Sequence, residues 1–148
     1  MKVQNIQSGF FLFFGILLCS CSKQPQPIDY GNDACHYCQM TIVDKIHGAE
    51  VVTDKGKIFK FDSAECLMRF SNDLVETDGY QFLTNYFESS EALIPIENAT
   101  FLISEEIPSP MGAYLTAFES QQVAAATKRQ KGGKIYNWKE IKNHINAN

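Results

Sequence analysis

Residues 58–65 read IFKFDSAE and contain the end of one predicted element and the start of the next. The first four residues partly alternate between apolar and polar side chains, which is typical of a β-strand. Asp62 or Ser63 can then cap a helix, and Glu65 can close a capping box on Asp62. The stretch therefore predicts a strand that leads directly into a helix.

A shorter form of this pattern recurs in the second half of the chain. Residues 61–63 (FDS) are echoed by residues 118–120 (FES), and each set ends a strand-like run and caps a helix. Two related halves would explain the echo, and they favour an α+β domain over a doubly wound sheet. We therefore predict a single small α+β domain of two similar strand–strand–helix halves over residues 29–148.

The other elements follow from β-branched runs, prolines, glycines and helix caps. Strands are predicted at residues 40–43, 49–53, 82–86, 100–104 and 113–118. Residues 107–110 form a loop because they contain two prolines. An Ala-rich helix ends at Gly132 and Gly133, and Asn137 with Glu140 forms a capping box before a short C-terminal helix.

The N-terminus has the pattern of a lipoprotein signal peptide, predicted over residues 1–20. Residues 9–18 (GFFLFFGILL) form an apolar run shorter than the roughly 20 residues that a membrane-spanning helix needs. The LCSC sequence that follows resembles a lipobox, in which Cys21 is acylated and becomes the new N-terminus; an ordinary secretory signal is the alternative. Residues 21–28 are predicted to be a tether, because SKQPQP is polar and contains proline.

Composition restricts the function classes that fit the chain. The formal net charge is −4 at pH 7, and Lys2 leaves with the signal peptide. The basic block at residues 128–131 (KRQK) is interpreted as a solvated helix end, so we expect no nucleic-acid partner. We also find no Ser-His-Asp arrangement, phosphate loop or paired-carboxylate motif, and we expect that the protein is not an enzyme.

Three cysteines, Cys35, Cys38 and Cys66, remain in the exported domain when Cys21 is set aside. An odd number outside the cytoplasm argues against a complete disulfide framework and indicates at least one functional or buried thiol. We expect Cys66 and Met68 to be packed in the first helix rather than to bind a ligand.

The CHYCQM sequence at residues 35–40 is the chemically informative motif. A zinc ribbon would need a second C-x-x-C or a histidine pair, and a c-type haem site would need histidine at residue 39. A thioredoxin-like dithiol would begin a helix, whereas a strand pattern follows here. A structural disulfide between Cys35 and Cys38 and a copper(I) site both stay open.

The copper(I) alternative rests on soft sulfur ligands. Thiolate and thioether sulfurs select Cu(I) over hard cations. In an extended segment Cys38 and Met40 would point to the same face, with Cys35 or His36 within reach from the turn. Met111 lies in a loop without helical or strand periodicity, and it could approach Cys38 from the other half. The two other histidines, His47 and His144, are expected to be solvated.

The chain resembles the NosL family, the copper-binding accessory lipoproteins of nitrous oxide reductase. The resemblance covers most of residues 29–140 and is strongest in four segments: residues 35–41, 60–66, 100–103 and 109–113. It implies a small α+β fold with two similar halves. Matched residue by residue, it also implies that Cys38, Met40 and Met111 are copper ligands, with Cys35 as a less secure fourth.

The resemblance further implies a metallochaperone that delivers Cu(I) for the maturation of nitrous oxide reductase. Its expected partners are the nitrous oxide reductase apoprotein and an ABC-type maturation transporter. The protein would be anchored to a membrane of the cell envelope through its N-terminal lipid and would face the periplasm. Two alternatives are a thiol–disulfide oxidoreductase that uses Cys35 and Cys38, and a structural lipoprotein in which this pair is a staple.

The first prediction concerns the lipid anchor. Mass spectrometry of the membrane-extracted protein should find an acylated N-terminal fragment that begins at Cys21, because the LCSC sequence directs cleavage before that cysteine. Cys19 is the internal comparison, since bulky Leu18 would occupy its −1 position. Cleavage elsewhere, or an unmodified Cys21, would show that the lipobox interpretation is wrong.

Overall fold

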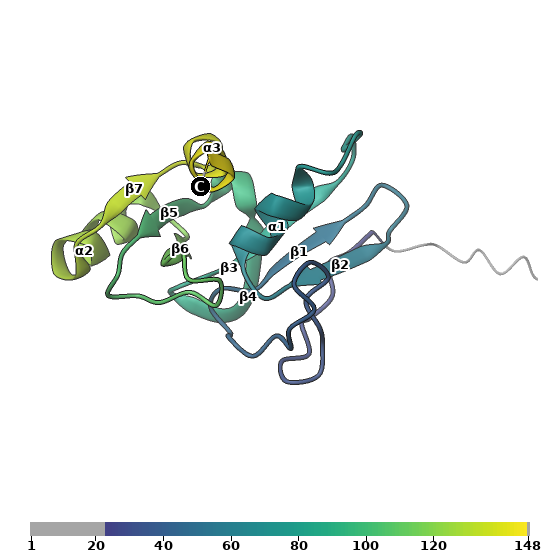
Figure 1. The fold of residues 1–148 in the computed structure, drawn as a ribbon, viewed down its shortest axis with the longest axis horizontal. Helices are drawn as coiled ribbons and strands as arrows, with labels where there is room; N and C mark the ends of the chain where they lie inside the picture. Colours follow the sequence, from purple (N-terminus) through teal and green to yellow (C-terminus); the bar gives the residue numbers. More distant parts are fainter. Residues whose placement is uncertain (1–22, 148) are drawn as a thin grey trace, which may run out of the picture.

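The computed structural model describes residues 23–147. The predicted signal peptide and the predicted lipid attachment site at Cys21 lie outside these residues. Within them, no helix has both the length and the apolar character needed to cross a membrane. The described chain forms two small antiparallel sheets with helices packed against and between them (Figure 1).

The first half is built on a four-stranded sheet with the order β2-β1-β3-β4. Its elements in chain order are β1 (Ala49–Val52), β2 (Ile58–Phe61), α1 (Ala64–Ser71), β3 (Gln81–Tyr86) and β4 (Ser89–Pro95). All neighbouring strands in this sheet are antiparallel.

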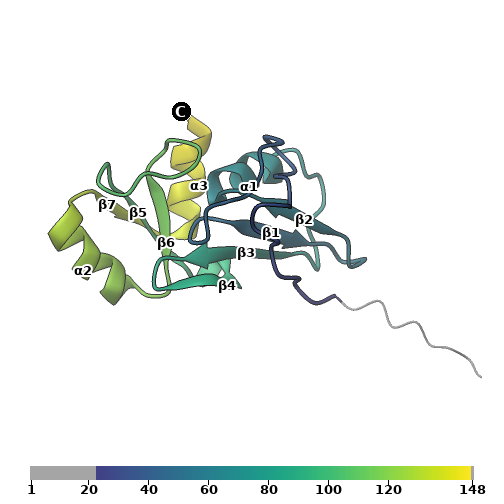
Figure 2. The same ribbon diagram turned by 90° about the horizontal axis from the view of Figure 1, so that it is seen from below.

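The second half is built on a three-stranded antiparallel sheet with the order β6-β5-β7. After a short 3-10 helix, η1 (Ile96–Asn98), its elements are β5 (Thr100–Ile103), β6 (Leu115–Phe118), α2 (Gln121–Lys131), β7 (Lys134–Tyr136) and α3 (Trp138–Ala147). The C-terminal helix α3 returns to the middle of the molecule and lies against α1 (Figures 1 and 2).

The two halves share one topology, which confirms the predicted repeat. In each sheet the first strand is central and pairs with the second and third, and a helix connects the second strand to the third. Ser63 and Ser120 cap these helices in extended backbone conformations, and their hydroxyl groups accept the N–H of Cys66 and Val123. The FDS and FES echo therefore marks equivalent strand–helix junctions.

One apolar core joins the two halves. Fully buried Phe61 and Leu67 come from the first half, and Phe101, Leu115 and Ile141 come from the second. Each such side chain stabilises the fold by about 1.5–3 kcal/mol relative to its exposed state. The core therefore fixes the position of one half relative to the other, which matters for any site that draws residues from both.

Most of the predicted elements are present, with some corrections. Residues 40–43 are not a strand, because Gln39 has a positive φ of 64° and only one isolated bridge, Ala34 to Thr41, forms here. Strands β4 and β7 were not predicted. The predicted capping box on Asp62 is wrong, since Ser63 caps α1 and the Glu65 side chain bonds to Ser109 instead.

The described part of the predicted tether is attached to the first sheet. The Lys23 carbonyl accepts from Gln81 Nε2 at 2.8 Å, and the Gln26 amide donates to Glu50 Oε1 at 3.0 Å. Lys60 Nζ donates to the Pro27 carbonyl at 2.8 Å. Most of these tether side chains are exposed, as expected for a polar segment, but its backbone is fixed to the domain.

The domain should fold without a metal ion. Its core contains large apolar side chains from both halves, in contrast to a zinc finger, whose folding depends on the ion. Circular dichroism of the reduced, metal-free domain should show mixed helix and strand and a cooperative thermal transition. A disordered spectrum that becomes ordered only on addition of metal would contradict this.

Candidate metal centre

The CHYC segment forms a tight turn that brings both of its cysteines to one side. The Cys35 amide donates to the Met40 carbonyl at 2.8 Å, and the Gln39 amide donates to the Cys35 carbonyl at 3.0 Å. Gln39 closes the turn in the left-handed region, a conformation that costs a non-glycine residue free energy. The strain is localised at the residue that follows the second cysteine.

Backbone N–H groups point at the two sulfur atoms of this turn. Those of Cys38, Asp62 and Tyr37 bond to Cys35 Sγ, and that of Met40 bonds to Cys38 Sγ. Hydrogen bonds to a thiolate favour the charged form over the thiol. The thiolate is the form that binds metals, so these bonds favour metal binding by the turn, although at Cys38 burial outweighs them and raises the pKa.

Strand β2 fixes the turn in place. The His36 amide donates to the Lys60 carbonyl at 2.8 Å. The His36 ring packs on Phe59, with centroids 4.5 Å apart, and edge-on against Phe70 at 5.3 Å. His36 therefore packs against aromatic rings, and it is not among the residues that surround the sulfur atoms.

Helix α1 and the residue before its N-cap add two further candidate ligand atoms to the pair. Sγ of Cys35, Cys38 and Cys66 and a carboxylate oxygen of Asp62 all lie within 4.8 Å of one another. The Cys38 thiol donates to Asp62 Oδ2 at 3.5 Å, while Asp62 Oδ1 has no hydrogen-bond partner within the described part of the chain. Cys66 is in the first turn of α1, where the helix dipole favours a negative charge.

The three thiols differ in acidity. The Cys66 thiol donates a hydrogen bond to Cys35 Sγ, and this bond is the largest cause that lowers the pKa of Cys35 from 9.0 to about 6. The same bond raises the pKa of Cys66, and burial and Asp62 act in the same direction. Burial raises the pKa of Cys38 as well. The hydrogen bonds of the metal-free site therefore favour the thiolate at Cys35 over a thiolate at Cys38 or Cys66.

The site borders a surface cavity of about 350 Å³. Its lining residues are Met40, Thr41, Val43, Asp44, Asp62, Pro108, Ser109 and Pro110. Its walls therefore come from both halves: the segment after the cysteine turn on one side and the β5–β6 connection on the other, which meets the dark blue loops in Figure 1. Asp62 is the member of the cluster that lines this cavity.

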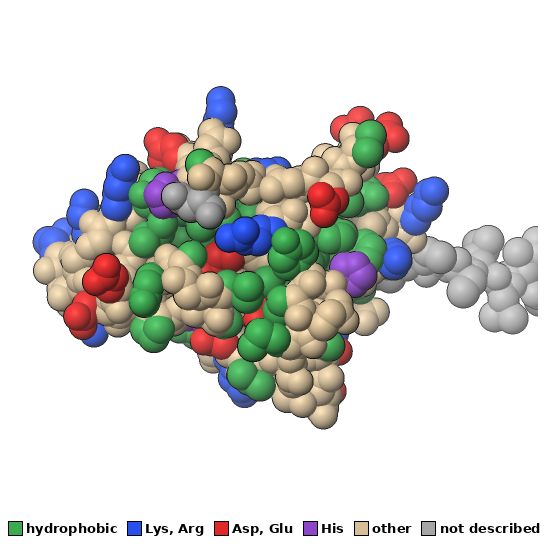
Figure 3. Space-filling view, in the orientation of Figure 1, with side chains coloured by type: hydrophobic (Ala, Val, Ile, Leu, Met, Phe, Trp, Pro, Cys, Tyr) green, Lys and Arg blue, Asp and Glu red, His purple; other side chains and the backbone are tan. Residues whose placement is uncertain are grey.

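The predicted methionine ligands lie on the exposed side of this region. Met40 lines the cavity and is 56% exposed, and Met111 follows Pro110 and is 36% exposed. Tyr37 in the cysteine turn and Val43 and Tyr114 in the two segments that form the cavity walls are also exposed. Hydrophobic side chains also gather across the middle of the face shown in Figure 3. The assignment of Cys35, Cys38, Met40 and Met111 as ligands stays a prediction.

The remaining candidates are resolved as follows. Met68 and Cys66 are both buried, as predicted. The Cys66 sulfur also belongs to the cluster, so packing is not the whole role of Cys66. The expectation that His47 is solvated is wrong: it is 4% exposed, with Nδ1 2.9 Å from Asp44 Oδ2 and Nε2 3.1 Å from Thr116 Oγ1. His144 is exposed and stacks on Tyr136.

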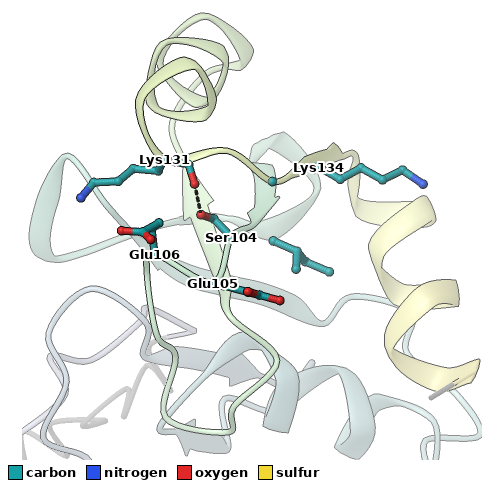
Figure 4. A pocket seen from close by; sticks show the side chains of 7 residues that line it. Ser104, Glu105, Glu106, Lys131 and Lys134 are labelled. Atoms are coloured by element: carbon teal, nitrogen blue, oxygen red, sulfur yellow. Dashed lines mark hydrogen bonds between the residues drawn. The ribbon is translucent and has the colours of Figure 1, made fainter.

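A larger cavity, of about 520 Å³, lies at the far end of the second half (Figure 4). It is lined by Ile103, Ser104, Glu105, Glu106, Lys131, Gly133 and Lys134. The Ser104 hydroxyl donates to the Lys131 carbonyl at 2.8 Å, and the acidic and basic side chains point in different directions. Without sulfur or histidine it offers no soft ligands, so the cysteine cluster is the better candidate site.

Sequence reasoning missed Asp62 and Cys66 as partners of the cysteine turn. Both were recognised, Asp62 as a helix cap and Cys66 as a packed residue. The sequence does place both residues at one helix start, because Asp62 directly precedes the Ser63 cap and Cys66 lies in the first turn after it. What the sequence could not supply was the contact between this helix start and a turn more than twenty residues earlier.

The fold and the site define a class: a two-sheet α+β domain with a sulfur-rich candidate metal site beside a surface cavity. The NosL family model matches residues 27–145, and the chain belongs to this family. Among solved structures, the crystal structure of the copper chaperone NosL from Shewanella denitrificans superimposes with a TM-score of 0.67 at 25% sequence identity. The match covers 80% of this chain and 96% of that chain. No curated protein matches the chain.

The acidity of Cys35 gives a testable pH dependence. Its folded-state pKa of about 6 lies below its ordinary value, so the stabilisation from its thiolate is present above the ordinary thiol pKa and is lost as the pH falls through 6. Ultraviolet absorbance of the reduced, metal-free domain should show one thiolate forming near pH 6. Cys66→Ala should raise that midpoint because it removes the hydrogen-bond donor. An unchanged midpoint in this variant would contradict the assignment.

Proposed function

We propose that this protein is a copper(I) chaperone of the cell envelope. The observation that carries the proposal is the cluster of three thiols and one carboxylate beside a surface cavity. Thiolates and thioethers are the ligands that select Cu(I), and the structurally similar Shewanella denitrificans protein is a copper chaperone. In this proposal copper is the cargo of the protein.

The proposed ligands are arranged from the interior to the surface. Cys35 and Cys38 form the main pair of ligands, and Cys66 supplies a third sulfur from the buried side. Met40 and Met111 complete the site from the exposed side. The neutral thioethers bind the ion without adding charge, so an acceptor protein can displace them first. This order fits a protein that must hold Cu(I) and later release it.

We further propose that the client is the nitrous oxide reductase apoprotein, reached through an ABC-type maturation transporter. The support for this step is membership of the NosL family. A lipid on Cys21 would hold the domain close to the membrane surface that faces the periplasm. Only Ser22 separates Cys21 from Lys23, whose carbonyl is bound by Gln81, and two residues span at most about 7 Å.

The geometry favours this function over thiol–disulfide exchange. A dithiol oxidoreductase needs an accessible cysteine of low pKa as its nucleophile. Here the cysteine with the lowered pKa, Cys35, has no exposed surface, and the partly exposed Cys38 has a raised pKa. A buried thiolate held by amide groups is better suited to binding an ion than to attacking a disulfide.

The proposed ligands can be tested by anaerobic titration with Cu(I) in competition with a Cu(I) chelator. The reduced domain should bind one equivalent. Cys35→Ser and Cys38→Ser should each weaken the affinity by about a hundredfold or more, because each removes a thiolate ligand, and Met40→Leu and Met111→Leu by about tenfold.

Met68→Leu is the matched control, since Met68 is buried in α1. This variant should bind Cu(I) with the affinity of the unchanged protein. If both cysteine variants kept full affinity, the proposed function would be wrong. If only Met40→Leu and Met111→Leu matched the control, the thioether part of the ligand set would be wrong.

A further inference from the structure

A buried carboxylate connects the two halves beside the candidate metal centre. Glu65 lies in the first turn of α1 and is 1% exposed, and its Oε1 accepts a 2.5 Å hydrogen bond from the Ser109 hydroxyl. Its other oxygen, Oε2, has no hydrogen-bond partner among the described residues. Burying a carboxylate with one such bond costs free energy, so an apolar side chain would suit stability alone better.

Ser109 in turn organises the loop that carries Met111. Its hydroxyl accepts the Leu115 amide at 3.2 Å, and its carbonyl accepts the Gly112 amide at 3.0 Å. The second bond closes a β-turn with Pro110 and Met111 at its two central positions, and Gly112 follows with a φ of 75°. Ser109 therefore fixes both the turn and the strand that follows it.

Glu65 lies between this turn and the thiol cluster. It precedes Cys66 directly, so the first turn of α1 carries both a clustered sulfur and the acceptor for Ser109. Ser109 and Pro110 form one wall of the cavity whose other wall contains Met40 and Asp62. A shift of the Ser109 hydroxyl would therefore change the distance between the Met111 turn and the sulfur atoms of the other half.

We propose that Glu65 is a positioning residue that holds the Ser109–Gly112 turn over the thiol cluster and so allows Met111 to complete the metal site. The proposal rests on the copper function proposed above. It assigns Glu65 a role through its hydrogen bond to Ser109 and gives its negative charge no part in binding the ion.

The test is a double-mutant cycle measured by Cu(I) competition titration. Glu65→Leu should weaken the affinity about tenfold, in the range found when a group that orients a metal ligand is removed. In the Glu65→Leu background, Met111→Leu should cost less than about twofold, because Met111 is already misplaced. Additive losses in the double variant would overturn the proposal.

A conservative variant separates position from charge and from simple loss of folding. Glu65→Gln keeps the size and an oxygen that can accept from Ser109, and it removes the charge. It should therefore retain the affinity and the sensitivity to Met111→Leu. If Glu65→Gln lost as much affinity as Glu65→Leu, the charge rather than the position would be responsible, and the proposal would be wrong.

Amide hydrogen exchange provides a readout without copper. The Leu115 amide should exchange faster in Glu65→Leu than in the unchanged protein, and Glu65→Gln should restore its protection. Glu50→Leu is the matched control: Glu50 is a fully buried carboxylate on β1 that binds the Gln26 amide instead, and this variant should leave both Leu115 exchange and Cu(I) affinity unchanged.

The two readouts also keep the two proposals apart. If the Cys35 and Cys38 variants bound Cu(I) normally but Glu65→Leu accelerated Leu115 exchange, the proposed copper function would be wrong. The role of Glu65 in positioning the turn would then still be supported. If copper binding needed both cysteines but Glu65→Leu changed neither Leu115 exchange nor the effect of Met111→Leu on Cu(I) affinity, only the positioning role of Glu65 would be wrong.

Discussion

The hydrogen bond from the His36 amide to the Lys60 carbonyl connects the cysteine turn to the rest of the domain, and the geometry of the site depends on it. The turn belongs to neither sheet, so no ladder of strand hydrogen bonds fixes its position. Strand β2 is at the edge of its sheet, which leaves backbone groups on its outer side free to accept the turn. The same strand continues through Asp62 into α1, so one short segment sets the positions of all four clustered candidate ligand atoms.

The extent to which sequence predicted this arrangement depends on whether a feature is local. The strand at residues 58–61, the cap at Ser120 and the box of Asn137 with Glu140 follow from neighbouring residues, and all are present. Contacts between distant segments were harder to predict. A helical apolar pattern cannot distinguish a cysteine that only packs from one whose sulfur faces another segment, which is why the role of Cys66 was missed. His47 was assigned to solvent because, although Asp44 is only three residues away, its second partner Thr116 is on the other half.

The repeat also explains why the chemistry resides in one half. Cys66 and Val123 occupy equivalent positions, because each donates its amide to the serine that caps its helix. Asp62 and Glu119 precede those serines in the same way. The second half thus keeps the junction but lacks the thiol and the cysteine turn. Its contribution is the β5–β6 connection, which forms a wall of the cavity. One half supplies the clustered thiols and carboxylate, and the other supplies the facing wall of the cavity.

Charge balance gives a physical reason for placing thiols inside and thioethers outside in the proposed site. Cu(I) with one thiolate is neutral, and each further thiolate adds a negative charge that is costly to bury. The hydrogen bond between Cys66 and Cys35 keeps one proton in the cluster, so the metal-free site avoids adjacent buried anions. Methionine sulfur adds a bond to the ion without adding charge, and at the surface it can be exchanged for a ligand of another protein. An ion bound by this set of ligands would be held most strongly by the thiols on the buried side and most weakly by the thioethers on the cavity side. It would therefore leave toward the surface, where an acceptor can dock.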